Sequence, residues 1–215
     1  MEIYGGILSP YVARVILTAR HKGLKHKLIM PEGGLKTPQF LAMNPLGKIP
    51  TVKDGGTVLF ESGVIVDYLD AKSKKNRIVP ANAKDAARAR LIAQVFAEYV
   101  QAPTLTLFRQ RDPATRDQKV VEAKLAEINK GLDVAEKLMA GKAWAAGAKF
   151  TIADAYAVPC LFFMEAMLPQ FGMTDVSGGR KKFKKYIAAV KKNKLTAGVL
   201  AEMAEAMKNF RPGGR

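Results

Sequence analysis

Apolar and polar positions follow two different patterns along the chain, and the change falls near residue 80. Before that point, short apolar stretches that favour strands alternate with stretches of helical spacing. The expected strands are 1–4, 25–30, 51–53 and 57–60. The expected helices are 10–22, about 37–43 and 61–72. The turn Asp54-Gly55-Gly56 between the last two strands favours a hairpin, so the predicted order is βαβαββα.

From residue 84 onward the spacing of apolar residues is helical almost throughout. The expected helices are 84–110, 116–140, 152–171, 180–192 and 194–209. Spacings of three and four predict one buried stripe, formed by Val121, Leu125, Ile128, Leu132, Ala135 and Leu138. Pro103 has no N–H to donate to the preceding turn, so we expect it to bend the first of these helices.

These patterns predict an α/β N-terminal domain followed by an all-α helical C-terminal domain. The expected limits are 1–75 for the first domain, 76–83 for a linker, 84–210 for the second domain and 211–215 for a loose tail. A chain of 215 residues with 48% hydrophobic residues carries enough apolar material for two such cores.

Composition excludes several classes of protein. A single cysteine, Cys160, excludes an intramolecular disulfide framework and a Cys-rich zinc site. The only histidines are His21 and His26, so we expect no metal site. Apolar runs are short or broken by Glu, Gln or Pro, and the N-terminus lacks the basic stretch and apolar core of a secretory signal. We therefore expect no membrane span and a cytoplasmic location.

The charge balance is strongly basic, with 35 Lys and Arg against 19 Asp and Glu and a net charge of +16. Eight bases and no acid lie in the segment Arg180–Lys194, which favours an anionic partner such as a small acid, nucleic acid or an acidic membrane. Phe183, Ile187 and Val190 repeat there at helical spacing, so the solvated face of an amphipathic helix explains the same residues. No recognised nucleic-acid motif accompanies the charge, and we expect neither a nucleic-acid nor a membrane partner.

Ser9-Pro10 stands where the first strand gives way to the first helix. Serine is a preferred N-cap and proline a preferred first helical residue, so a simple cap explains both. The same geometry places a hydroxyl beside unpaired N–H groups and the positive end of the helix dipole, where it can hold an anion or a thiolate. Tyr4 and Tyr11 are neighbouring hydroxyls that offer similar chemistry.

Two further groups of residues complete a candidate site. Ile49-Pro50 heads a strand, so it should lie at a sheet edge or adopt a cis bond that leaves the Ile49 backbone free to pair with an extended ligand. Lys48 adds a cation beside it, although a tight turn without a ligand explains these residues too. Glu61-Ser62 opens a helix and offers N–H groups and a hydroxyl to a carboxylate, or forms an ordinary helix start. Together the three groups describe a site for an extended zwitterionic peptide that ends in a nucleophile.

Ser9-Pro10-Tyr11 with Arg14-Val15, the run Asn44–Val52 and Glu61-Ser62 resemble the thioredoxin-like half of the cytosolic glutathione S-transferases. In the helical half, the run Phe150–Ala155 resembles the N-capping box of that family. The resemblance covers nearly the whole chain in the right order, and the N-terminal motif looks like the bacterial-type, serine-class members.

The resemblance implies a role for each matching residue. Ser9 would activate the thiol of glutathione, with Tyr4 and Tyr11 as alternatives. The residues implied in glutathione binding are Lys36, Lys48, Ile49, Glu61 and Ser62. Those implied in structure alone are Pro50, Thr151 and Asp154. Gly63 departs from several classes, which carry a larger or charged residue there, so we expect one ligand contact of those classes to be missing.

The resemblance also implies the reaction. Glutathione would be the co-substrate, and its thiolate would attack a small hydrophobic electrophile without the help of a metal. The resemblance also implies a role in detoxification and a homodimeric assembly. Candidates for the wall of the second-substrate pocket are Tyr11, Phe96, Tyr99 and Phe108, with core packing as the alternative for these aromatic rings. A protein of this fold that binds partners without catalysis is the alternative function.

Overall fold

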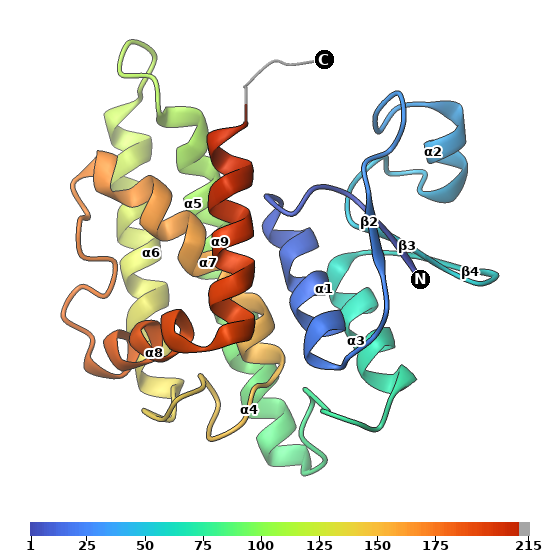
Figure 1. The fold of residues 1–215 in the computed structure, drawn as a ribbon. Helices are drawn as coiled ribbons and strands as arrows, with labels where there is room; N and C mark the ends of the chain where they lie inside the picture. Colours follow the sequence, from blue (N-terminus) through green and yellow to red (C-terminus); the bar gives the residue numbers. More distant parts are fainter. Residues whose placement is uncertain (211–215) are drawn as a thin grey trace. The chain divides into compact units, whose positions relative to one another are not determined.

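The N-terminal strands and helices of the computed structural model follow the order βαβαββα, as predicted (Figure 1). The structure describes residues 1–210, and the tail predicted at 211–215 lies outside the described residues. The strands are β1 (Glu2–Tyr4), β2 (Lys27–Ile29), β3 (Thr51–Asp54) and β4 (Thr57–Phe60). The helices among them are α1 (Pro10–His21), α2 (Pro38–Met43) and α3 (Ser62–Lys72).

The four strands form one mixed sheet in the order β2-β1-β3-β4. β1 runs parallel to β2, while β3 is antiparallel to both of its neighbours. α1 and α3 contact each other on one side of the sheet, and α2 lies on the other side (Figure 1). Of the two alternatives expected for Ile49-Pro50, a sheet edge or a cis bond, the structure has the cis bond. β3, which follows Pro50, lies inside the sheet.

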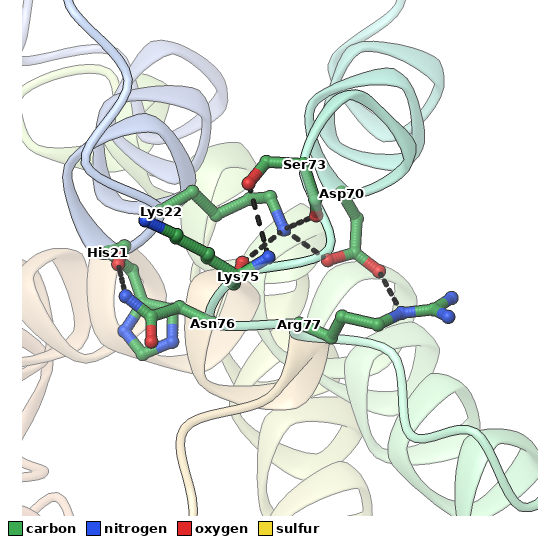
Figure 2. Close-up of polar contacts among 7 residues, drawn as sticks. All are labelled: His21, Lys22, Asp70, Ser73, Lys75, Asn76 and Arg77. Carbon is green, nitrogen blue, oxygen red and sulfur yellow. Dashed lines mark hydrogen bonds and ion pairs between the residues drawn. The ribbon is translucent and has the colours of Figure 1, made fainter.

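Lys22 ties the end of α1 to the end of α3 (Figure 2). Its side chain is fully buried, and its Nζ atom donates to Asp70 Oδ1 at 2.9 Å. The same Nζ atom donates to the carbonyl oxygens of Ser73 at 2.9 Å and Lys75 at 3.0 Å. Asn76 Nδ2 donates to the His21 carbonyl at 2.9 Å. An ammonium has three donors, so these three acceptors satisfy it and fix the chain that leaves α3.

The rest of the described chain is helical, as predicted. The elements are α4 (Ala83–Gln94), a π-helical segment (Val95–Gln101), α5 (Ala102–Leu107), a 3₁₀ turn (Phe108–Gln110), α6 (Gln118–Leu138), α7 (Ile152–Met167), a 3₁₀ turn (Leu168–Phe171), α8 (Lys181–Lys192) and α9 (Lys194–Lys208). Two compact units result among the described residues: residues 1–77 together with 197–210, and residues 78–196. The domain limits expected from the sequence stay a prediction.

The single helix predicted over 84–110 is interrupted by the π-helical segment Val95–Gln101. Pro103 follows this segment and cannot donate to the Tyr99 carbonyl, which widens the helical ladder at this point. The Tyr99 carbonyl lies against Gly131 of α6, where an added Cβ atom would stand 2.6 Å from the oxygen. Close contact between α6 and the π-helical segment therefore requires glycine at residue 131.

α6 and α7 supply much of the core of the helical unit. Four residues of the stripe predicted on α6 are buried, namely Val121, Ile128, Leu132 and Ala135. The helical run Ile152–Phe171 is long and apolar enough to cross a membrane by length and composition alone, but 83% of its most apolar window is buried inside the protein. Burial of that extent is typical of a central helix in a globular core.

Candidate functional site

A cavity of about 470 Å³ opens in the first unit where α1, the loop before β3 and α3 begin. Its walls are formed by Ser9, Tyr11, Leu35, Asn44, Gly47, Lys48, Ile49, Pro50, Glu61 and Ser62. The three groups of residues singled out in the sequence, which are up to 53 positions apart, therefore meet around one space. The helix starts and the loop supply N–H groups, hydroxyls and a cation to it.

Ser9 is the N-cap of α1 and lines this cavity. Its backbone is extended, and its Oγ atom accepts from the Val12 N–H at 3.4 Å. A serine hydroxyl can accept at its lone pairs and still donate its hydrogen. The Ser9 hydroxyl is therefore held at the positive end of α1 with a hydrogen to offer a ligand.

Asn44 holds the loop that carries Lys48 and Ile49. Its side chain is almost fully buried, and its Nδ2 atom donates to the Lys48 carbonyl at 2.8 Å and to Thr51 Oγ1 at 3.0 Å. Its Oδ1 atom accepts from the Leu46 N–H at 3.0 Å. These bonds join the two sides of the loop and tie it to Thr51, the first residue of β3, so the backbone of Ile49 is presented to the cavity in a fixed conformation.

Lys36 does not belong to the cavity wall but lies at the same loop. An added Cβ atom at Gly47 would stand 2.8 Å from the Lys36 Nζ atom. Gly47 also has a φ of +58°, a backbone conformation that favours glycine. Lys36 and Lys48 thus both contribute positive charge on this side of the site.

Glu61 and Ser62 form the opposite wall at the start of α3. Glu61 has a φ of +65°, which is uncommon for a residue with a side chain and is typical of residues held for function. Its side chain makes no capping bond to α3. Ser62 is buried, and its Oγ atom accepts from Arg14 Nη1 at 3.3 Å.

The three hydroxyls considered for the reactive position are separated by the structure. Tyr11 lines the same cavity as Ser9 and is 38% exposed. Tyr4 lines a different cavity, beside Phe40 and Met43. Its hydroxyl donates to Glu2 Oε2 at 2.9 Å, and this bond to a carboxylate raises the pKa of Tyr4 above its usual value.

The aromatic residues expected around a second substrate have different surroundings. Phe96 is fully buried in the helical unit, with its ring 5.8 Å from that of Phe183, so core packing describes it. Tyr99 is 55% exposed. The Phe108 ring is covered by the Arg111 guanidinium at 3.5 Å.

Thr151 and Asp154 lie at the start of α7 in the helical unit. Asp154 Oδ2 accepts from the Thr151 N–H at 2.7 Å and from the Thr151 hydroxyl at 3.1 Å. Its Oδ1 atom accepts from the Ala145 N–H at 2.9 Å. Burial raises the pKa of Asp154 to about 6, although these hydrogen bonds lower it.

Two residues of the site have no role in the interpretation of the sequence, namely Arg14 and Asn44. Arg14 falls among the apolar residues Val12, Val15 and Ile16 of α1, and a charge in such a place is a signal of a buried polar contact. Asn44 has only turn chemistry as its signal. Within residues 1–210 no three His, Cys, Asp or Glu side chains gather closely enough to hold a metal ion.

Comparison with known proteins identifies both halves of the chain. The model of the glutathione S-transferase N-terminal domain matches residues 8–72, and that of the C-terminal domain matches residues 95–192. Glutathione S-transferase 3 of Zea mays is 36% identical over 165 residues, which cover 72% of this chain and 74% of the plant protein.

Solved structures show the same relationship across the whole fold. Glutathione S-transferase III in its apo form has a TM-score of 0.79 and 29% identity, over 99% of each chain. Glutathione S-transferase-I bound with lactoylglutathione has a TM-score of 0.79 and 25% identity, over 94% of this chain and 98% of that one. With both domain models and a relative above 30% identity, this chain belongs to the glutathione S-transferase family.

Proposed function

We propose that the protein is a glutathione transferase that binds glutathione in the 470 Å³ cavity and transfers its thiolate to a small hydrophobic electrophile. The observation that carries this proposal is the meeting of Ser9, Ile49 and Ser62 around that cavity. Family membership supports glutathione as the co-substrate.

We assign each part of the tripeptide to a group in the cavity or beside it. The Ser9 hydroxyl takes the thiol, and the Ile49 backbone takes the cysteinyl unit. Glu61 and Ser62 take the ammonium and carboxylate of the γ-glutamyl end. Lys48 and Lys36 supply the positive charge for the glycyl carboxylate, because cations with several donors stabilise carboxylates.

The start of α1 has enough electrostatic strength to ionise the thiol. A cysteine thiol has a pKa of about 8.5, and lowering it by two units requires about 2.7 kcal/mol. A hydroxyl donor and a helix dipole each contribute roughly 1–2 kcal/mol. Ser9 is the N-cap, so it offers both contributions at one point.

The serine type of activation is part of this proposal, and Tyr11 is the remaining alternative within the same cavity. The bacterial-type relationship stays a prediction, since the relative compared above comes from Zea mays.

We also propose a homodimer, a role in detoxification and a cytoplasmic location, as suits a family member with this composition. Tyr11, Tyr99 and Phe108 are the candidates for the second-substrate wall, whereas Phe96 is fully buried in the core of the helical unit.

Replacing Ser9 by alanine tests the proposal. We expect turnover with a chromogenic electrophile to fall at least about 100-fold, because the donor to the thiolate is lost, while glutathione affinity changes less than about threefold. The chromogenic assay and titration calorimetry measure these two effects, and ultraviolet difference spectra follow the loss of the bound thiolate. Tyr11→Phe is the matched control and should keep most of the turnover.

Unchanged turnover in Ser9→Ala would move the role to Tyr11. Binding of glutathione by the unaltered protein without turnover of any electrophile in a broad panel would instead support the non-catalytic alternative.

A further inference from the structure

Arg14 is a buried cation directly beside the candidate site. It lies on α1 between the buried residues Val12 and Val15, and only 4% of its surface is exposed. Its Nη1 atom donates to Ser62 Oγ at 3.3 Å, and its guanidinium lies 5.2 Å from the centre of the Tyr11 ring. Ser62 and Tyr11 both line the cavity, so Arg14 supports two of its walls from behind.

The bond between Arg14 and Ser62 fixes the direction of the serine hydroxyl. A guanidinium carries donors only, so the Ser62 oxygen must be the acceptor. The single hydrogen of the Ser62 hydroxyl is therefore directed away from Arg14. Ser62 is the first residue of α3 and lines the cavity, so this hydrogen is available to an acceptor bound there.

Donation from a cation also makes the hydroxyl a better donor. Hydrogen bonds in a chain polarise one another, and the effect is larger where water is excluded. Ser62 is 6% exposed, so the chain from guanidinium to hydroxyl to ligand runs through a buried region. The ligand group that gains most is an anionic acceptor, because its bond to the hydroxyl is charge-assisted.

We propose that Arg14 is a positioning residue that holds the Ser62 hydroxyl as a donor to the free carboxylate of the γ-glutamyl end of glutathione. This inference rests on the proposed function, which places that carboxylate at Ser62. It adds a residue that acts through Ser62 and assigns its effect to one group of the ligand.

A pair of ligands tests this assignment. Glutathione is compared with γ-aminobutyryl-cysteinyl-glycine, which keeps the ammonium, the thiol and the glycyl end but lacks the γ-glutamyl carboxylate. Arg14→Met keeps a long side chain without donors. We expect Arg14→Met to weaken glutathione binding about tenfold in titration calorimetry and to change binding of the analogue less than about twofold.

A double-mutant cycle separates positioning from general stability. Arg14→Met should add almost nothing to the loss already caused by Ser62→Ala, because Arg14 acts on the carboxylate only through the hydroxyl that Ser62→Ala removes. A residue that only stabilises the fold would weaken both ligands equally and would act independently of Ser62. Either of those results overturns the inference.

Should Arg14→Met not fold, Arg14→Lys is measured with the same two ligands. An ammonium does not reproduce the fork of a guanidinium, so we expect about a threefold loss for glutathione alone. Equal losses for both ligands overturn the inference here as well. Failure of the unaltered protein to bind millimolar glutathione would overturn the proposed function itself, which distinguishes the two failures.

Discussion

At the scale of single residues, the local sequence predicts Ser9 as a helix cap, and the fold separates it from one of the two competing hydroxyls. Ser9-Pro10 is sufficient to predict a helix start, and the structure has Ser9 as the N-cap of α1. The sequence left Tyr4 and Tyr11 as alternatives to Ser9, because all three hydroxyls lie at the end of the first strand or shortly after it. Only the folded chain directs the Tyr4 hydroxyl to Glu2 and leaves Tyr11 with Ser9.

Asp154 makes the stability of the protein depend on pH. Burial raises the pKa of Asp154 to about 6 from a usual value of 3.8. The folded state therefore holds this proton more tightly than the unfolded state. The contribution of Asp154 to the free energy of unfolding is largest below pH 4, and it falls by about 3 kcal/mol as the pH rises through 6.

Asp154→Asn removes this titration. We expect the free energy of unfolding of the variant, measured in urea between pH 4 and 8, to lack the fall through pH 6 that the unaltered protein shows. The difference between the two proteins is then the readout, since all other titrating groups are shared. Parallel curves over this range would contradict a raised pKa at Asp154.

At the scale of elements, the buried contact between Lys22 and Asp70 joins α1 to α3 (Figure 2). Lys22→Met leaves the carboxylate of Asp70, which is 4% exposed, without its buried ammonium. We expect the free energy of unfolding in urea to fall by about 3–5 kcal/mol.

Lys22→Met combined with Asp70→Leu is the control for this effect. Removing both charges should restore part of the lost stability, because a buried ion pair replaced by apolar groups often costs little. If the double variant were no more stable than Lys22→Met, the penalty would not come from the loss of the ammonium beside the Asp70 carboxylate.

Elements with strong local signals were predicted well, and those decided by packing were not. The hairpin over 51–60 follows from its glycine turn, with Gly55 at a φ of +61°, and α6 follows from its apolar stripe. The helix over 84–110 was predicted as one element, but it contains the π-helical segment Val95–Gln101. Pro103 is a signal in the sequence that this helix is irregular. That the irregularity is a π-helical segment depends on the close approach of Gly131 from α6.

At the scale of the whole molecule, the net charge of +16 raises the question of polyanion binding. Three of the eight bases in Arg180–Lys194 have partners within the helical unit. Arg180 pairs with Asp133, Lys182 donates to the Met139 carbonyl, and Lys191 pairs with Glu165. Phe183 and Val190 are buried, so the apolar face of α8 is used for packing.

We therefore expect weak binding of nucleic acid. Fluorescence anisotropy with a 20-base-pair duplex, taken as about two turns of DNA, should give a dissociation constant above about 100 μM at physiological salt. Lys184→Glu combined with Lys185→Glu, both at exposed positions of α8, is the matched control. Micromolar binding that falls steeply with salt and is lost in this variant would reveal a polyanion partner.

The sequence by itself determined the order of the elements and the capping chemistry at the starts of the helices. Capping, turns and apolar periodicity act over a few residues, so they can be recognised without the fold. The tertiary structure decided the strand order, the burial of Phe96 in the core and the contact of Arg14 with Ser62, 48 residues away. These features depend on which distant surfaces exclude water from each other, and that is a property of the packed chain.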